Sequence, residues 1–405
     1  MNKTKSKFSV KKLMVGLAAG VLALLLAAFG AVWMIWGPEL RTLGSFRKIL
    51  DRNDAHLDGA VYEMTVSGDY YFEDFLAQGG VSTDADLIAF ITQNLTKGLV
   101  DLEFTPPDVA CASFTAQLEN GHQVFARNYD YAKTNTCIVY TDPGQGRHAS
   151  VSTVDLQFLG LDVDQDVTGL MDKITCLAAP YIPFDGMNEA GVSCGIYMTY
   201  QGPDASVATA QDTEKPDITS TTLLRLILDY ADTVEEAVAL AEAYDLHDSA
   251  TSSYHYMVAD ASGRSAILEW VAGTDTTDTD GSARQLRVTY NDQDALALSP
   301  EWQVVTNFVV VPEYYENEAD RKGVDRYQHL QQQLDQADGL LPDADAALDL
   351  LAQVGRRSWK NDDGNGCTVH SVVYDLTDKT ALWVPNEHFG EADRIQHLTL
   401  AKKAS

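Results

Sequence analysis

Apolar and polar positions divide the chain into one continuous apolar stretch near the N-terminus and a long region of alternating strand and helix signals. The apolar stretch runs without a charge from Leu13 to Trp36. It is long enough to cross a hydrocarbon core of about 30 Å, and Trp33 and Trp36 lie at the end, where aromatic side chains prefer the interface. The pattern predicts a transmembrane helix over residues 13–36.

Charges around this stretch predict its orientation. Residues 1–12 contain five lysines and no acid, although basic residues also follow the stretch at positions 41, 47, 48 and 52. A short, purely basic N-terminal side favours a cytoplasmic N-terminus. We therefore expect a single-pass protein of the cell membrane, with a cytoplasmic basic segment over 1–12 and everything after residue 37 extracytoplasmic. A cleaved signal peptide usually has a shorter apolar region, although AFGA could pass for a weak cleavage site.

Residues 37–110 read as a segment of their own. GSFRKILDRNDAHLDGAVYEM predicts a helix, and the stretch near Asp84 to Val100 predicts an amphipathic helix. The double proline in EFTPPDVA then stops any helix and predicts an extended, accessible connector before Cys111. We interpret 37–110 as a helical pro-segment or small subunit.

Strand pairs dominate residues 111–405, and helices appear in separate pairs. Strand pairs are predicted within CASFTAQLENGHQVFARNYD, YIPFDGMNEAGVSCGIYMTY, YHYMVADASGRSAILEWVAG and TVHSVVYDLTDKTALWVPN. Helices are predicted at TSTTLLRLILDYA, DTVEEAVALAEAYDL, DRYQHLQQQLDQ and DAALDLLAQV. Antiparallel strands grouped apart from paired helices predict an α+β layered sandwich.

The first strand pair carries candidate chemistry. Asn120-Gly121 predicts a two-residue turn, which would put Cys111 directly across from Asp130. Arg127 would then lie on the opposite face of its strand unless a bulge or a sharp twist redirects it.

A cut before Cys111 would change the chemistry of this pair. The new α-amine, with an ordinary pKa near 8, is a base within reach of its own thiol. We then expect Asp130 to hold the amine and Arg127 to favour the thiolate. Without a cut, we interpret Cys111 as a small residue of the core, and we interpret Arg127 and Asp130 as a surface ion pair.

Composition narrows the function. A formal net charge of −30 argues against a general nucleic-acid binder, which needs a basic face. The nine histidines show no metal-ligand spacing, so we expect neither a metal nor a cofactor, and His370 reads as a core histidine. Five cysteines outside the cytoplasm could form up to two disulfides. Cys137, Cys176, Cys194 and Cys367 are expected to be core or disulfide residues.

Further motifs follow Cys111 in a fixed order. ARNYD supplies an arginine and an aspartate, and DGMNEAGVSCGI, VVTNF, DRYQHL and HSVVYDL come later. With these motifs the chain from Cys111 onward resembles the linear-amide C–N hydrolases of the N-terminal-nucleophile superfamily. That group includes choloylglycine hydrolases, penicillin V acylase and, more distantly, acid ceramidase and the penicillin acyltransferases.

The resemblance implies a fold and roles for individual residues. The fold is a four-layer αββα sandwich, and the Cys111 thiolate attacks an amide carbonyl to form a thioester. Asn307 and a second donor stabilise the oxyanion, while Arg127 and Arg326 balance charge. Asp130 orients the amine.

One position departs from the family pattern. Bile salt hydrolases carry a second asparagine where this chain has Met198, so the adjacent Tyr197 is a candidate donor for substrate binding. The cysteine also lies deep in the chain, which resembles the acid-ceramidase and acyltransferase branches. We therefore expect a precursor that is cut at Ala110–Cys111.

The implied substrate is a small N-acyl amide, and an anchor near lipid favours an apolar acyl part. Three alternatives stay open. One is acyl transfer through the same thioester, and another is a catalytically inert, anchored binding protein with the same fold. The third is a thiol hydrolase that pairs Cys111 with a histidine.

Overall fold

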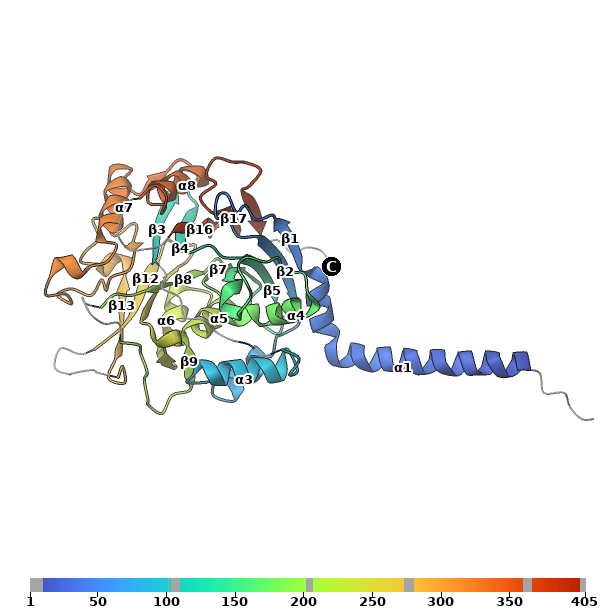
Figure 1. The fold of residues 1–405 in the computed structure, drawn as a ribbon. Helices are drawn as coiled ribbons and strands as arrows, with labels where there is room; N and C mark the ends of the chain where they lie inside the picture. The colour runs from blue at the N-terminus through green and yellow to red at the C-terminus, as the bar shows by residue number, and fades with distance from the viewer. Residues whose placement is uncertain are drawn as a thin grey trace, which may run out of the picture.

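The chain begins with a long apolar helix, α1 (Val10–Ser45), which extends away from the folded body (Figure 1). The computed structural model describes residues 10–100, 102, 110–201, 207–272, 280–359 and 366–400. Within these ranges, Met14–Ser45 is the one helix long and apolar enough to cross a membrane, and its most apolar window is 0% buried. Such a helix suits a membrane span or a signal sequence. The predicted basic segment lies largely outside the described residues, as does most of EFTPPDVA.

The last turns of α1 dock on the folded body. Pro38 lies inside the helix, and beyond it Glu39 and Thr42 are buried, with exposed fractions of 5% and 3%. These turns pack against strand β2 (Val61–Ser67). The apolar helix therefore joins the body without a flexible linker.

Nine strands form the larger sheet, in the order β1-β2-β5-β6-β7-β8-β11-β12-β13. Neighbouring strands pair antiparallel except β2 and β5, which pair in parallel. Besides β2, the strands are β1 (Arg47–Leu50), β5 (Thr136–Asp142), β6 (Ser150–Asp155), β7 (Asp185–Asn188), β8 (Ser193–Met198), β11 (Tyr254–Ala259), β12 (Ser265–Val271) and β13 (Gln285–Tyr290).

The second sheet has seven strands, in the order β14-β3-β4-β16-β17-β18, with β15 parallel to β3 at one side. Its strands are β14 (Val304–Val305), β3 (Ala110–Leu118), β4 (Gln123–Tyr131), β16 (Cys367–Asp375), β17 (Thr380–Pro385), β18 (Gln396–Thr399) and β15 (Leu340–Leu341). A separate small pair consists of β9 (Asp217–Thr219) and β10 (Asp245–His247).

Helices cover the outer face of each sheet, and the inner faces meet where β3 packs on β8. α5 and α6 pack on the nine-stranded sheet, whereas α7 and α8 pack on the seven-stranded sheet (Figure 1). This is the expected αββα layering of an α+β fold. The helices after α1 are α2 (Phe72–Ala77), α3 (Asp84–Asn94), α4 (Leu170–Thr175), α5 (Ser220–Tyr230), α6 (Val234–Glu242), α7 (Val324–Gln336) and α8 (Ala344–Gln353). Short 3-10 turns lie at η1 (Leu156–Leu159), η2 (Cys176–Tyr181), η3 (Ser249–Thr251), η4 (Asn291–Gln293) and η5 (Glu318–Asp320).

The segment 37–110 differs from the expected helical one. The stretch predicted as a helix contains β1 and β2, which form one edge of the nine-stranded sheet. The residues VYEMTVS are rich in β-branched and aromatic side chains, and pairing with β5 satisfies their backbone. The expected amphipathic helix is present as α3, capped by Thr83.

The register of the first hairpin is also corrected. Cys111 pairs with Tyr129, and Ala110 pairs with Asp130, one residue away from the prediction. The loop has three residues rather than two, because the Leu118 N–H donates to the His122 carbonyl and Gly121 adopts a φ of +87°. The β3–β4 pairing is regular, and the local irregularity lies in β16 instead, between Thr368 and His370.

Candidate active site

Cys111 lies second in β3 and is fully buried between the two sheets. Its backbone N–H donates to Asn307 Oδ1 at 3.1 Å. Its thiol lies 3.4 Å from Arg127 Nη2 and 3.9 Å from the Ile196 carbonyl oxygen on β8. The thiol and the backbone nitrogen therefore face different partners.

Arg127 reaches the thiol from the neighbouring strand β4. Residues 127 and 129 point to the same face as Cys111, because directly paired residues share a face. Arg127 Nη2 also donates to the Ile196 carbonyl at 2.6 Å, and Nε donates to Asp185 Oδ2 at 3.0 Å. The guanidinium is thus held rigidly beside the sulfur.

Asp185 anchors this arrangement. Besides Arg127 it binds His370 Nε2 at 2.8 Å and the Tyr374 hydroxyl at 2.7 Å. Burial alone would raise the pKa of Asp185, but the neighbouring His370 and Arg127 hold it below its ordinary value. Asp185 is therefore an ionised, fully paired partner for the arginine.

Asp130 points to the other face of β4, toward the outer helices. Its carboxylate binds Arg326 at 2.8 Å and Arg356 at 3.0 Å, and it accepts a hydrogen bond from the Thr368 hydroxyl at 2.6 Å. The expectation that Asp130 directly faces Cys111 is wrong, because the register differs by one residue. Asp130 instead reaches Cys111 through Arg326.

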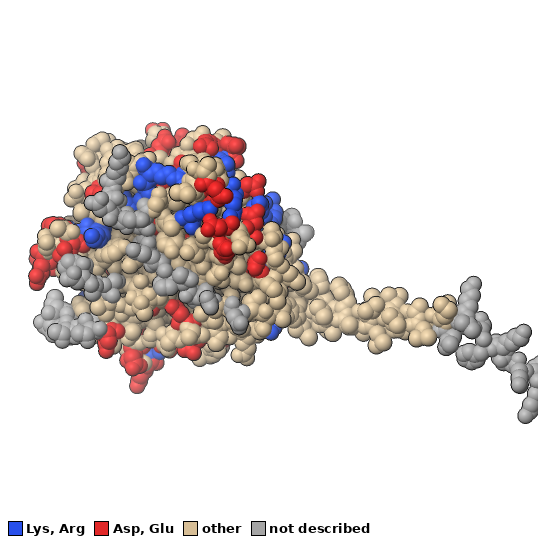
Figure 2. All heavy atoms as spheres, in the orientation of Figure 1, with Lys and Arg blue, Asp and Glu red and all other residues tan. Residues whose placement is uncertain are grey.

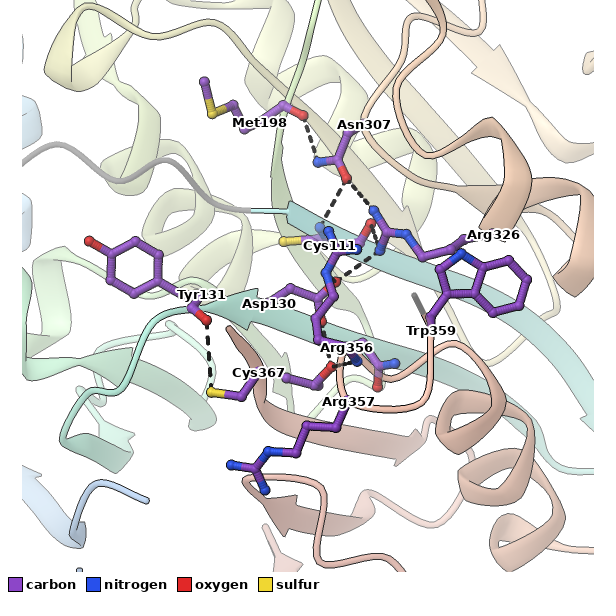
Figure 3. Close-up of polar contacts among 12 residues, drawn as sticks. Cys111, Asp130, Tyr131, Met198, Asn307, Arg326, Arg356, Arg357, Trp359 and Cys367 are labelled. Atoms are coloured by element: carbon purple, nitrogen blue, oxygen red, sulfur yellow. Dashed lines mark hydrogen bonds and ion pairs between the residues drawn. The ribbon is translucent and has the colours of Figure 1, made fainter. Parts of the chain in front are cut away.

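Arg326, from the first turn of α7, connects these groups (Figure 3). One guanidinium nitrogen donates to Asp130 and, at 3.2 Å, to the Cys111 carbonyl, while the other donates to Asn307 Oδ1 at 2.9 Å. Asn307 Nδ2 donates to the Met198 carbonyl at 2.8 Å. These partners fix which end of the amide is oxygen. Asn307 thus presents an acceptor to the Cys111 nitrogen.

Tyr197 lies behind Arg127. Its ring faces the guanidinium, whose carbon is 4.3 Å from the ring centroid, and its hydroxyl donates to Ser113 Oγ at 2.6 Å. It is fully buried in β8. These contacts give Tyr197 a role in holding Arg127, and its role toward substrate stays a prediction.

The electrostatics distinguish Cys111 from the other thiols. All five cysteines are free and buried. Burial raises the pKa of the Cys111 thiol, and Arg127 opposes that rise. Burial raises the pKa of Cys367 to about 12 and also raises that of the other three cysteines. Among the five, Cys111 is the one with an arginine nitrogen within 3.4 Å of its sulfur.

Sequence reasoning missed the groups that hold the arginines and Asp130. Asp185 opens the DGMNEAGVSCGI motif, so a signal existed, but the sequence analysis assigned this residue no role. His370 is buried as expected, yet it contacts Asp185. Arg356 and Thr368 carried no local signal, since they meet Asp130 only through the tertiary fold.

A small apolar cavity lies near the site. Ile196, whose carbonyl approaches the Cys111 sulfur, lines it together with Phe158, Ile182, Phe184 and Tyr254. Asp84, at the start of α3, also lines it. Both the 37–110 segment and the later domain therefore shape this cavity.

Two groups among the described side chains have metal-like spacing. They are His56, Asp58 and His388, and His122, Asp375 and Asp378. Arg357 Nη1 lies 2.7 Å from His56 Nε2, where a cation would be repelled. Neither group shares a residue with the Cys111 site.

Comparison with known families agrees with this geometry. Residues 111–277 match the family model of linear amide C–N hydrolases, choloylglycine hydrolase family, which confirms the resemblance read from the sequence. No curated protein matches the chain.

Among solved structures, the chain is similar to a penicillin V acylase from Agrobacterium tumefaciens, at 18% identity and a TM-score of 0.46 over 68% of this chain and 83% of that one. A mutant of conjugated bile acid hydrolase from Clostridium perfringens gives 14% identity and 0.48 over 72% and 92%. An N-acylethanolamine-hydrolyzing acid amidase ortholog from Caenorhabditis elegans gives 16% identity and 0.38 over 66% and 93%.

Proposed function

We propose that the chain is a membrane-anchored, extracytoplasmic hydrolase of linear amide C–N bonds that cleaves N-acyl amides through a Cys111 thioester. The match of residues 111–277 to the model of that family supports the proposal. The enzyme becomes active when the chain cuts itself at Ala110–Cys111. The observation that carries the proposal is the contact of the Cys111 nitrogen with Asn307 while its sulfur faces Arg127.

The environment of the scissile bond supports self-cleavage. Ala110 and Cys111 are 2% and 0% exposed, and both lie in β3. The prediction of an accessible bond is therefore wrong for these two residues, because strand pairing buries them. Another protease could not reach this bond in the folded chain, whereas the Cys111 thiol is adjacent to it.

The cut proceeds by an N-to-S acyl shift. The sulfur attacks the Ala110 carbonyl carbon, the C–N bond breaks, and the thiol proton moves to the released nitrogen. Water then hydrolyses the thioester, which leaves a carboxylate on Ala110 and a free thiol and α-amine on Cys111. The amine forms where the backbone nitrogen already contacts Asn307 Oδ1.

The same groups serve turnover. The α-amine takes the thiol proton as the sulfur attacks the substrate carbonyl, and it returns that proton to the leaving amine. Arg127 stabilises the thiolate, and Arg326, paired with Asp130, orients Asn307. The second hydrogen of Asn307 Nδ2 is a candidate oxyanion donor, as the family resemblance implies. Water finally hydrolyses the acyl-enzyme.

The apolar cavity supports an acyl group without charge as the substrate's anchor. Phe158, Phe184 and Ile196 offer it apolar contact, and the backbone carbonyl of Ile196 lies 3.9 Å from the sulfur. Its wall at Asp84 supports the interpretation of 37–110 as a small subunit that stays in place after the cut.

The proposal is tested by N-terminal sequencing and intact mass of the active protein. We expect one fragment that begins at Cys111 and another that ends at Ala110. Cys111→Ala should stay uncut and inactive, whereas Cys194→Ala, which removes an equally buried thiol, should be cut and active. Active protein that is continuous across Ala110–Cys111 would overturn the mechanism.

A further inference from the structure

A second cavity lies at the junction of α1 with the folded body; Figure 2 shows the apolar helix joining that body. It is lined by one face of α1, the end of β2 and two later leucines. Its residues are Pro38, Glu39, Thr42, Val66, Ser67, Asp69, Tyr70, Tyr71, Leu95 and Leu177. The proposed hydrolysis uses none of them.

Glu39 is the polar centre of this cavity. It is 5% exposed, and its Oε1 accepts from the Tyr71 hydroxyl at 3.0 Å, with Lys97 Nζ at 3.6 Å. Its Oε2 has no hydrogen-bond partner among the residues that the structure describes. A buried carboxylate oxygen normally has a partner, so this oxygen is available to a ligand that donates hydrogen bonds.

Glu39 is the charged group that favours a hydrogen-bond donor in this cavity. Asp69 also lines it, but Arg147 Nη2 donates to the Asp69 backbone carbonyl at 3.4 Å and offsets the charge of Asp69. Lys97, whose side chain is 24% exposed, lies on the other oxygen of Glu39 and donates to the Tyr71 hydroxyl at 2.8 Å. Glu39 Oε2 therefore stays open to a donor.

The backbone at this place is unusual. Tyr70, Tyr71 and Lys97 have φ values of 40°, 60° and 51°, which bulky side chains rarely adopt. Such conformations persist only where surrounding contacts hold them, and they cluster at ligand sites. Here Tyr70 and Tyr71 line the cavity, and Lys97 donates to the Tyr71 hydroxyl.

The cavity lies at the edge of the apolar helix. Glu39 follows Trp36 by three residues, or roughly 4.5 Å along a helix. Trp33 lies under the Arg41 guanidinium, 5.8 Å from it, as expected for side chains at a membrane interface. If α1 spans the bilayer, Glu39 lies at the level of the lipid headgroups.

We propose that this cavity binds the headgroup of a phospholipid with a primary ammonium, an inference that rests on the proposed membrane span. The ammonium donates to Glu39 Oε2, and the headgroup phosphate lies near Lys97 at the exposed side. A primary ammonium has three hydrogen-bond donors, whereas a quaternary ammonium has none. The site therefore selects ethanolamine over choline headgroups.

Native mass spectrometry of the full chain in detergent tests the site, with phosphatidylethanolamine, phosphatidylcholine and phosphatidylglycerol offered in equal amounts. We expect retained phosphatidylethanolamine, and at least about tenfold less of it on Glu39→Gln. Glu63→Gln is the matched control, because Glu63 lies on β2 but outside the cavity. Equal retention of the three lipids, or an unchanged Glu39→Gln, would overturn the proposal.

Two further experiments, crosslinking and competition by free ethanolamine, test the same site independently of the Glu39→Gln variant. A photoactivatable phosphatidylethanolamine should crosslink to residues 66–71 and 95–97 in the unaltered chain, so the test holds even if Glu39→Gln fails to fold. Free ethanolamine should not displace the lipid at equal concentration, and displacement would show a soluble-amine site instead. Extraction of membranes at alkaline pH tests the span itself. A chain that is extracted refutes the anchor, whereas a retained chain without lipid preference refutes only the headgroup site.

Discussion

Tyr70 offers a test of whether the two fragments stay together after the proposed cut. It lies before the cut, and its hydroxyl bonds both carboxylate oxygens of Asp229, at 2.7 Å and 2.6 Å, which lies after the cut. Both residues are buried. Tyr70→Phe removes this contact and leaves the ring in place, so it should weaken the association of the fragments.

The structure bounds the size of the effect. A buried hydrogen bond to a charged group contributes about 1.5–3 kcal/mol. Asp229 keeps Arg225 at 2.8 Å and Arg147 at 3.4 Å, so the substitution does not leave its charge unpaired. The loss should stay within that range, which corresponds to a roughly 10- to 150-fold higher dissociation constant.

The assay uses cut protein immobilised through its N-terminal fragment, with release of the 111–405 fragment followed after dilution. Tyr70→Phe should release it faster, whereas Tyr244→Phe, at a half-buried tyrosine that follows the cut in sequence, should behave as the unaltered protein. In a Cys111→Ala chain, the same Tyr70→Phe should lower the free energy of unfolding without any release. Rapid release from the unaltered protein, or no change on Tyr70→Phe, would show that this contact does not hold the fragments.

Three further predictions concern buried carboxylates. Asp130→Asn should lower turnover at least about 10²-fold, because Arg326 loses the partner that orients it. If the variant is only less stable and each folded molecule turns over at the parent rate, this prediction is wrong. Asp185→Asn should loosen Arg127, which raises the pKa of the Cys111 thiol, so the rising limb of the cutting rate in a pH profile should shift to higher pH. Burial raises the pKa of Asp155 to about 7, so this residue binds its proton more tightly in the folded than in the unfolded chain, where its pKa is near 3.8. Stability from this group is full below about pH 4 and is lost as pH rises through 7. Asp155→Asn should therefore be more stable than the parent at pH 8, by at most about 4 kcal/mol, and equal to it near pH 4 in urea unfolding.

The sequence predicted the order of elements and the residues that gather at the site better than it predicted on which face of a strand each side chain lies. The family resemblance brought Cys111, Arg127, Asn307 and Arg326 into one prediction. In the structure Arg127 contacts the Cys111 thiol, Asn307 contacts the Cys111 backbone nitrogen, and Arg326 contacts Asn307. Asn-Gly suggested a two-residue turn, but Gly121 closes a three-residue loop. A shift by one residue exchanges the faces of a strand, so Asp130 was assigned to the wrong side.

Other features could not be predicted from local sequence patterns. β2 is a strand because β5, far along the chain, supplies its parallel partner, and parallel pairs leave no hairpin signal. The partners of Asp130 likewise come from α7 and from the region before β16. These contacts exist only once both sheets and their outer helices have assembled.

An N-terminal nucleophile and an N-terminal anchor place opposite demands on one chain. The proposed cut frees the amine of Cys111 and, in the same step, severs the covalent link between α1 and the catalytic residues. The folded segment between them resolves this conflict. β2 contributes a full strand pairing with β5, Tyr70 reaches Asp229, and Asp84 lines the cavity beside the nucleophile. Loss of the segment would therefore open the apolar cavity that Asp84 lines and expose a sheet edge. On this reasoning, activity and membrane retention should disappear together when the fragments are separated, and neither should be lost by the cut alone.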